Sequence, residues 1–122
     1  MTNAPRKKGT AAESKVVSWW QAQGERQVER HALHGNYDVG DINGIPSLVQ
    51  SVKYAGPGKP IDLSGWLNEL ETMKRNARRK DPEWSGPAGL LIVSRPRYGD
   101  VGDWYAVQRV ADWWDLYREL LT

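Results

Sequence analysis

The chain has 122 residues, the length of one ordinary domain, and its formal net charge is only +2. Hydrophobic residues make up 39% and charged residues 26%, which is typical of a globular protein and not of a disordered chain. Cysteine is absent, which excludes a disulfide scaffold, a zinc–thiolate site and a cysteine nucleophile. The sequence shows no membrane-length apolar run and no signal peptide, so we expect a cytoplasmic protein without a membrane partner.

The N-terminal region predicts a basic arm followed by a helix. Residues 1–9 are polar, so we expect a flexible arm there and a single domain over residues 10–122. Apolar residues recur at helical spacing over 10–23, where Thr10 suits the N-cap and Glu13 follows at the capping-box spacing. The basic residues of the arm are Arg6, Lys7 and Lys8.

The rest of the chain alternates short extended segments with two more helices. The predicted helices start at Asp62 or Ser64 and at Asp112. The fold class that follows is α/β (α+β), a central mixed sheet flanked by helices in the order αβββαββα. The predicted strands cover residues 26–33, 39–42, 47–54, 88–94 and 104–108.

Three charged residues stand where the pattern predicts burial or a tight turn. Asp41 ends a short extended segment, Lys53 lies in an otherwise apolar strand, and Glu13 lies on the apolar stripe of the first helix. Such charges are costly unless they meet an opposite charge or a metal. Each also has a structural interpretation, as a turn residue, a snorkelling strand end or a capping-box partner. Their joint occurrence in this order is what indicates a site.

Three segments carry a resemblance to a known family. RKKGTAAES (6–14) looks like an opening K-G-x-x-x-E motif, ALHGNYDVGDI (32–42) like a loop with a catalytic aspartate, and SLVQSVKYAG (47–56) like an E-x-K strand. In this order they resemble the PD-(D/E)XK nuclease superfamily, and within it the archaeal-type Holliday junction resolvases and their small actinobacterial and phage relatives. The resemblance spans residues 6–108 and implies a restriction-endonuclease-like core with Glu13, Asp41 and Lys53 as catalytic residues.

One position departs from the family pattern. The acid of an E-x-K strand lies two residues before the lysine, and here that position is Ser51. Because strand side chains alternate between faces, Ser51 and Lys53 share a face and Gln50 points the other way. Either a β-bulge turns Gln50 onto the active face, or Ser51 or a water molecule fills the place of the acid. Both alternatives replace a carboxylate by a neutral oxygen.

The resemblance implies metal-dependent hydrolysis of DNA phosphodiesters, with branched DNA such as a Holliday junction as substrate and recombination as context. Asp41, Glu13 and Gln50 would hold Mg²⁺ or Mn²⁺, and Lys53 would orient water or stabilise the phosphoryl charge. DNA and a second copy of the chain, in a homodimer, are the implied partners, with no small-molecule cofactor. The alternative is a decayed nuclease fold that acts as a DNA- or protein-binding module, because position 51 is serine.

Clustered basic residues add a candidate DNA-contacting surface. Five cations fall within residues 74–80, where they could neutralise phosphates or merely complement the dipole at a helix end. The predicted nucleic-acid-binding residues are Arg6, Lys7, Lys8, His34, Lys74, Arg75, Arg78 and Arg79.

Overall fold

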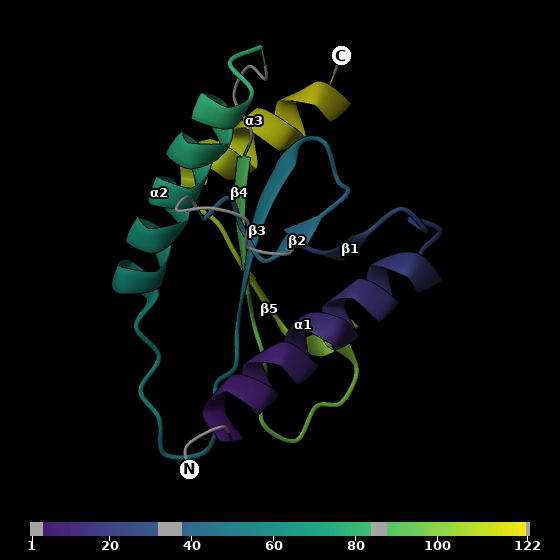
Figure 1. Ribbon diagram of the computed structural model, residues 1–122, viewed down its shortest axis with the longest axis vertical. Coiled ribbons are helices and arrows are strands. Elements are labelled where there is room, and N and C mark those ends of the chain that lie inside the picture. The colour runs from purple at the N-terminus through teal and green to yellow at the C-terminus, as the bar shows by residue number, and fades with distance from the viewer. Residues whose placement is uncertain (1–3, 32–37, 84–87, 122) are drawn as a thin grey trace.

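The computed structural model describes residues 4–31, 38–83 and 88–121, with side chains from residue 9 onward. The element order confirms the predicted α+β fold class, a mixed sheet flanked by helices in the order αβββαββα (Figure 1). In chain order the elements are α1 (Ala4–Ala22), β1 (Glu29–Arg30), β2 (Ile42–Asn43), β3 (Leu48–Lys53), α2 (Leu63–Lys80), β4 (Ala88–Val93), a 3₁₀ turn (Val101–Asp103), β5 (Tyr105–Val107) and α3 (Val110–Leu120).

The described strands form one five-stranded sheet in the spatial order β1-β2-β3-β4-β5. All neighbouring pairs are antiparallel except β3 and β4, which are parallel because α2 crosses over between them. The pairing of β3 with β4 is continuous from Leu48, opposite Ala88, to Lys53, opposite Val93. The two central strands therefore form a regular platform without a bulge between them.

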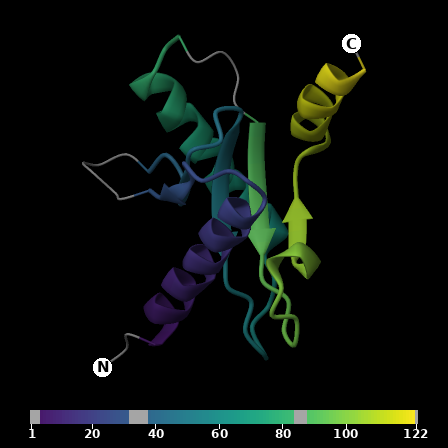
Figure 2. The ribbon, with the colours of Figure 1, turned by 90° about the vertical axis from the view of Figure 1, so that its right-hand side faces the viewer.

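Two apolar layers cover the two faces of the sheet. In the view of Figure 2, α1 crosses in front of the strands. Val16 of α1 packs with Val52 of β3 on one face. Leu70 of α2 packs with Val49 and Leu91 on the other face, as the predicted apolar stripe of that helix requires. Alternate residues of β3 therefore face α1 or α2, and this alternation decides which of its polar side chains can share a site.

The first helix begins earlier than the sequence indicates. α1 starts at Ala4, so much of the expected arm is helical and Thr10 lies inside the helix and not at its N-cap. Pro5 is compatible with this start because a proline in the first helical turn loses no hydrogen bond. Glu13 is therefore no capping-box residue. The side chains of Arg6, Lys7 and Lys8 lie outside the described part of the structure.

A buried ion-pair network joins α2 to the start of α3. Lys74 Nζ lies 2.9 Å from Asp112 Oδ1 and 2.9 Å from Glu71 Oε2, and Lys74 and Asp112 are both buried. Asp112 Oδ2 also accepts from the Gly89 N–H of β4 at 3.2 Å. Gly89 has no room for a Cβ, which would lie 2.8 Å from Leu70. The expectation that Lys74 contacts nucleic acid is wrong, because its ammonium is enclosed by these carboxylates.

The last helix contributes little to the core. Asp112 is its only buried residue among those described, whereas Trp113, Trp114 and Tyr117 are 40–49% exposed. The sequence predicts its start at Asp112, but the helix begins at Val110 and Asp112 turns inward towards Lys74. In the described part of the chain, no helix combines the length and apolar character that a membrane crossing requires.

Candidate active site

Asp41 lies against the edge of β3 where β2 begins. Its N–H donates to the Gln50 carbonyl at 2.8 Å, and its Oδ2 accepts from the Val52 N–H at 2.8 Å. The carboxylate therefore continues the hydrogen-bond ladder along β3. Gly40, with φ of +115°, allows this close approach, because a Cβ there would lie 3.0 Å from the Gln50 carbonyl oxygen. Asn76 of α2 fixes the preceding turn by donating to the carbonyl of Asp38 at 2.9 Å.

The environment of Asp41 opposes its negative charge. Burial raises the pKa of its carboxyl from an ordinary 3.8 to about 6, and repulsion from Glu13 and Asp38 adds to this rise. The Val52 hydrogen bond and the Lys53 ammonium act in the opposite direction, towards a lower pKa. Residues from α1, from the turn before β2 and from β3 thus act electrostatically on one carboxyl.

Glu13 reaches the site from α1. Its Oε1 lies 3.3 Å from Arg30 Nε of β1, and the Glu13 side chain is 20% exposed. Because its charge acts on Asp41, Glu13 belongs to the same electrostatic environment as that residue. The pairing with Arg30 partly compensates the cost of placing two carboxylates near each other.

Lys53 comes to the site from the end of β3 and meets a residue that the sequence analysis missed. Lys53 Nζ donates to Glu69 Oε2 of α2 at 2.7 Å. The 28% exposed Lys53 side chain also exerts its charge on Asp41. The only sequence signal for Glu69 is an acid beside Leu70 on the apolar stripe of the second helix. That signal does not say which strand the helix faces.

The two substitutes considered for the missing strand acid are both fully buried. Gln50 faces α1, where its Oε1 accepts from Trp20 Nε1 at 2.9 Å, and it is fully buried. The regular β3–β4 register leaves no bulge there to turn it, so Gln50 is wrong as a metal ligand and as a catalytic residue. Ser51 shares the face of Lys53 as expected and is fully buried, and the catalytic role considered for it stays a prediction. Ser51 Oγ has no hydrogen-bond partner among the described residues.

The remaining carboxylates fit one kind of metal site and not another. Among the described residues, no three His, Cys, Asp or Glu side chains are close enough to form a ready-made metal cage. Mg²⁺, however, usually keeps several waters and binds through one or two carboxylates together with substrate phosphates. Asp41, whose pKa is raised by burial and by the charges of Glu13 and Asp38, is the candidate carboxylate for a site of this second kind.

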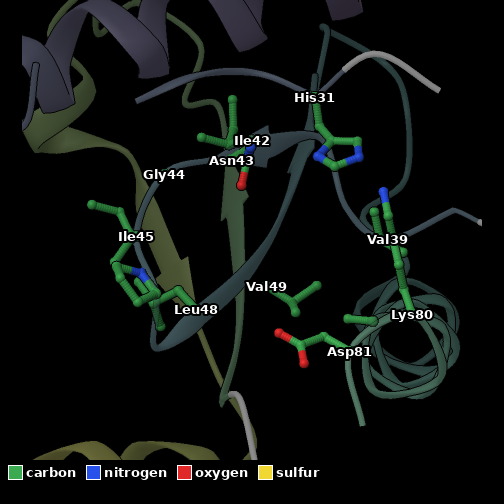
Figure 3. Close-up of a pocket in the computed structure, with 12 residues that line it drawn as sticks. His31, Val39, Ile42, Asn43, Gly44, Ile45, Leu48, Val49, Lys80 and Asp81 are labelled. Carbon is green, nitrogen blue, oxygen red and sulfur yellow. The ribbon is translucent and has the colours of Figure 1, made fainter. Parts of the chain in front are cut away.

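A cavity of about 620 Å³ lies beside this site, between the β2–β3 connection and the end of α2 (Figure 3). Its walls include Ile42 and Val49, with His31, Lys80 and Asp81 around them. None of Glu13, Asp41 or Lys53 lines it. The cavity is therefore a neighbour of the candidate active site and not the site itself.

The remaining basic residues lie along the last turns of α2. Arg75, Arg78 and Arg79 are exposed there, as expected for phosphate contacts, and Lys80 continues the row. Between Arg75 and Arg78 lie Asn76, which bonds to the segment before β2, and Ala77, which lines the adjoining cavity. The positive surface therefore adjoins the region of Asp41. His34 lies outside the described residues.

Comparison of the chain with protein-family models, curated proteins and solved structures found no match.

Proposed function

We propose that this chain is a divalent-cation-dependent DNA endonuclease, selective for branched DNA such as a Holliday junction. The observation that carries the proposal is Asp41, a half-buried carboxyl at the edge of a central strand, on which the charges of both Glu13 and Lys53 act. Two acids and a lysine, contributed by a helix, the residue before β2 and the end of β3, are the set that the family resemblance implies for phosphodiester hydrolysis. Mg²⁺ or Mn²⁺ is the proposed cofactor and DNA the proposed partner.

Each residue has a separate task in the proposed reaction. Asp41, with Glu13, would hold the cation, which when bound polarises the scissile phosphate and lowers the pKa of a water molecule. The Lys53 ammonium stabilises the negative charge that develops on the phosphoryl oxygens. The exposed arginines of α2 hold flanking phosphates, which positions the DNA without reading its sequence.

The first test is cleavage of labelled four-way junctions and linear duplexes by the purified chain with Mg²⁺ or Mn²⁺. We expect the wild type to cut, and Lys53→Ala to lower the rate by about 100-fold or more while leaving DNA affinity nearly unchanged. The matched control is Lys59→Ala, which removes an exposed lysine from the loop after β3 and should cut like the wild type.

A second candidate function is favoured by Ser51, a neutral and fully buried residue at the strand position where the family pattern has an acid. In this alternative the chain is a decayed nuclease fold that binds DNA or a protein partner without cutting. A wild type that shifts junction DNA in a gel but cuts no substrate with either metal would support this alternative and contradict the nuclease. Absence of DNA binding even at low salt would leave the protein-binding version.

The basic surface of α2 makes a separate prediction. Replacing Arg75, Arg78 and Arg79 together by glutamine should weaken DNA binding and reduce the slope of log K against log salt by about 2 to 3, since each lost phosphate contact removes about 0.9. Fluorescence anisotropy over a salt series measures this slope. Arg118→Gln, which removes an exposed arginine from α3, is the control. An unchanged slope in the triple variant would mean that the cluster only solvates a helix end.

The proposal extends to assembly and place of action. Two copies of the chain would cut opposed strands of a junction, and the exposed aromatic residues of α3, Trp113 and Trp114 among them, offer apolar surface for such pairing. Because the proposed substrate is DNA, the proposed place of action is the cytoplasm of a bacterial or phage-infected cell.

A further inference from the structure

The cavity beside Asp41 has the size and the inner walls of a small-molecule site. Its volume of about 620 Å³ lies within the range of ligand pockets in proteins, about 300–1,000 Å³. Its inner walls include the buried side chains of Ile42, Val49 and Ala77. Because these side chains are aliphatic, the inner part of the cavity favours an apolar group over a charged one.

The polar residues around the cavity differ from one side to the other. Lys80 extends towards His31, whereas the Asp81 carboxylate points towards Val49 (Figure 3). Both Lys80 and Asp81 are exposed. Asp81 Oδ1 accepts from the Glu83 N–H at 3.3 Å, which leaves the carboxylate further acceptor capacity. The Lys80 side therefore favours an anionic group, and the Asp81 side favours an N–H donor.

The cavity adjoins the chain segments that position Asp41. Ile42, in its wall, directly follows Asp41 in the chain. Val39, also in its wall, lies two residues before Asp41. His31 connects the two places directly, because its N–H donates to the Asp41 carbonyl at 2.9 Å. A molecule held in the cavity would thus lie next to the proposed site of hydrolysis.

We propose that this cavity binds a nucleotide, with the base between the aliphatic walls and the phosphate at Lys80. A nucleotide combines the three features that the cavity favours, since its base has apolar faces and N–H donors on its edge, and its phosphate is anionic. A carboxylate such as Asp81 accepts from the amino group of cytosine in protein–DNA complexes. The exposed Arg78 and Arg79 extend the positive surface from Lys80 to further phosphates.

This inference rests on the proposed function, which makes the nucleotide an unpaired one of the bound DNA. Taking a base out of the stack costs least where the base is already unpaired, as beside a branch point. The nucleotide site would therefore favour branched over fully paired DNA, a preference that Asp41 and Lys53 do not explain by themselves.

The test uses a DNA duplex that carries one unpaired fluorescent adenine analogue, whose emission is quenched while it stacks on neighbouring bases. Binding of the full chain should raise this emission. Val39→Phe should abolish the rise by filling the cavity, and its urea unfolding midpoint shows whether the variant folds. Lys80→Gln, at an exposed position, should weaken binding of this duplex by about tenfold. The matched control is Lys59→Gln, which removes an exposed lysine from the loop after β3 and should behave like the wild type.

A titration of adenosine monophosphate into the chain without DNA separates the outcomes. A wild type that binds the duplex without a rise in emission overturns the nucleotide site and leaves the nuclease proposal standing. A rise that persists in both Val39→Phe and Lys80→Gln also overturns the site, because the base then unstacks elsewhere. A chain that does not bind DNA, but binds the monophosphate and loses it in both variants, supports the site and contradicts the nuclease. A wild type that binds neither overturns both proposals.

Discussion

Asp41→Asn is expected to make the protein more stable at pH 7.5 while removing its proposed activity. The folded state holds the Asp41 pKa at about 6, against an ordinary 3.8, so at neutral pH folding forces an unfavourable charge into a partly buried position. At 1.36 kcal/mol per pKa unit this interval corresponds to about 3 kcal/mol. We expect a gain of about 1–3 kcal/mol, because the new amide still accepts from the Val52 N–H but must also satisfy its own N–H groups.

The pH dependence gives the sign of this effect. Between about pH 4 and pH 6 the folded chain retains the Asp41 proton that the unfolded chain releases, so the contribution of Asp41 to stability falls as the pH rises. The advantage of Asp41→Asn should therefore be present at pH 7.5 and vanish near pH 3.5, where both states are protonated. Urea unfolding at the two pH values measures it, with Asp115→Asn as an exposed control. Equal differences at both pH values would mean that Asp41 ionises freely.

Lys74→Met is expected to cost about 3–5 kcal/mol of stability, the largest effect of any single change considered for this chain. The substitution keeps the volume of the side chain but leaves the Asp112 carboxylate, which is 4% exposed, without a cation. Glu71 also pairs with Arg109, with 2.9 Å between Arg109 Nη1 and Glu71 Oε1. We expect this pair to remain in the variant. The cost therefore arises mainly at Asp112.

A second variant shows where that cost comes from. Lys74→Met combined with Asp112→Asn should recover most of the lost stability, because a neutral amide still accepts from the Gly89 N–H and no buried charge remains. Arg118→Met, which breaks the exposed pair with Asp115, should cost less than about 1 kcal/mol. Urea unfolding midpoints compare the three variants. Similar costs for Lys74→Met and Arg118→Met would contradict a buried network.

The alternation along β3 was the most reliable guide from sequence to site. The rule that strand side chains alternate correctly separates Gln50 from Ser51 and Lys53, and the apolar spacing of the second helix correctly identifies its buried face. Both are local properties, set by the geometry of one strand or one helix. The same applies to Asp62, whose N-cap position is visible from the residues that follow it.

The predictions that failed depend on residues far apart in the chain. From the sequence, Lys74 is one cation of a basic cluster. Its partner Asp112 lies 38 positions later in the chain, so the ion pair is not visible in a local pattern. From the sequence, Glu69 is interpreted as a solvated acid on a helix. Its ion pair with Lys53 depends on how α2 packs on β3. The burial of Gln50 follows from Trp20, 30 positions before it. Such partners are fixed by how elements pack, which no local pattern records.

The shallow attachment of α3 bears on the lifetime of the protein in a cell. Of its described residues only Asp112, in the first turn, is buried, so the turns beyond it have few contacts to lose when they open. Free energies of local opening are lowest in segments of this kind, and proteases cleave chains in their transiently opened states. The last helix, in which Asp112 is the only buried residue among those described, is thus where we expect proteolysis to begin.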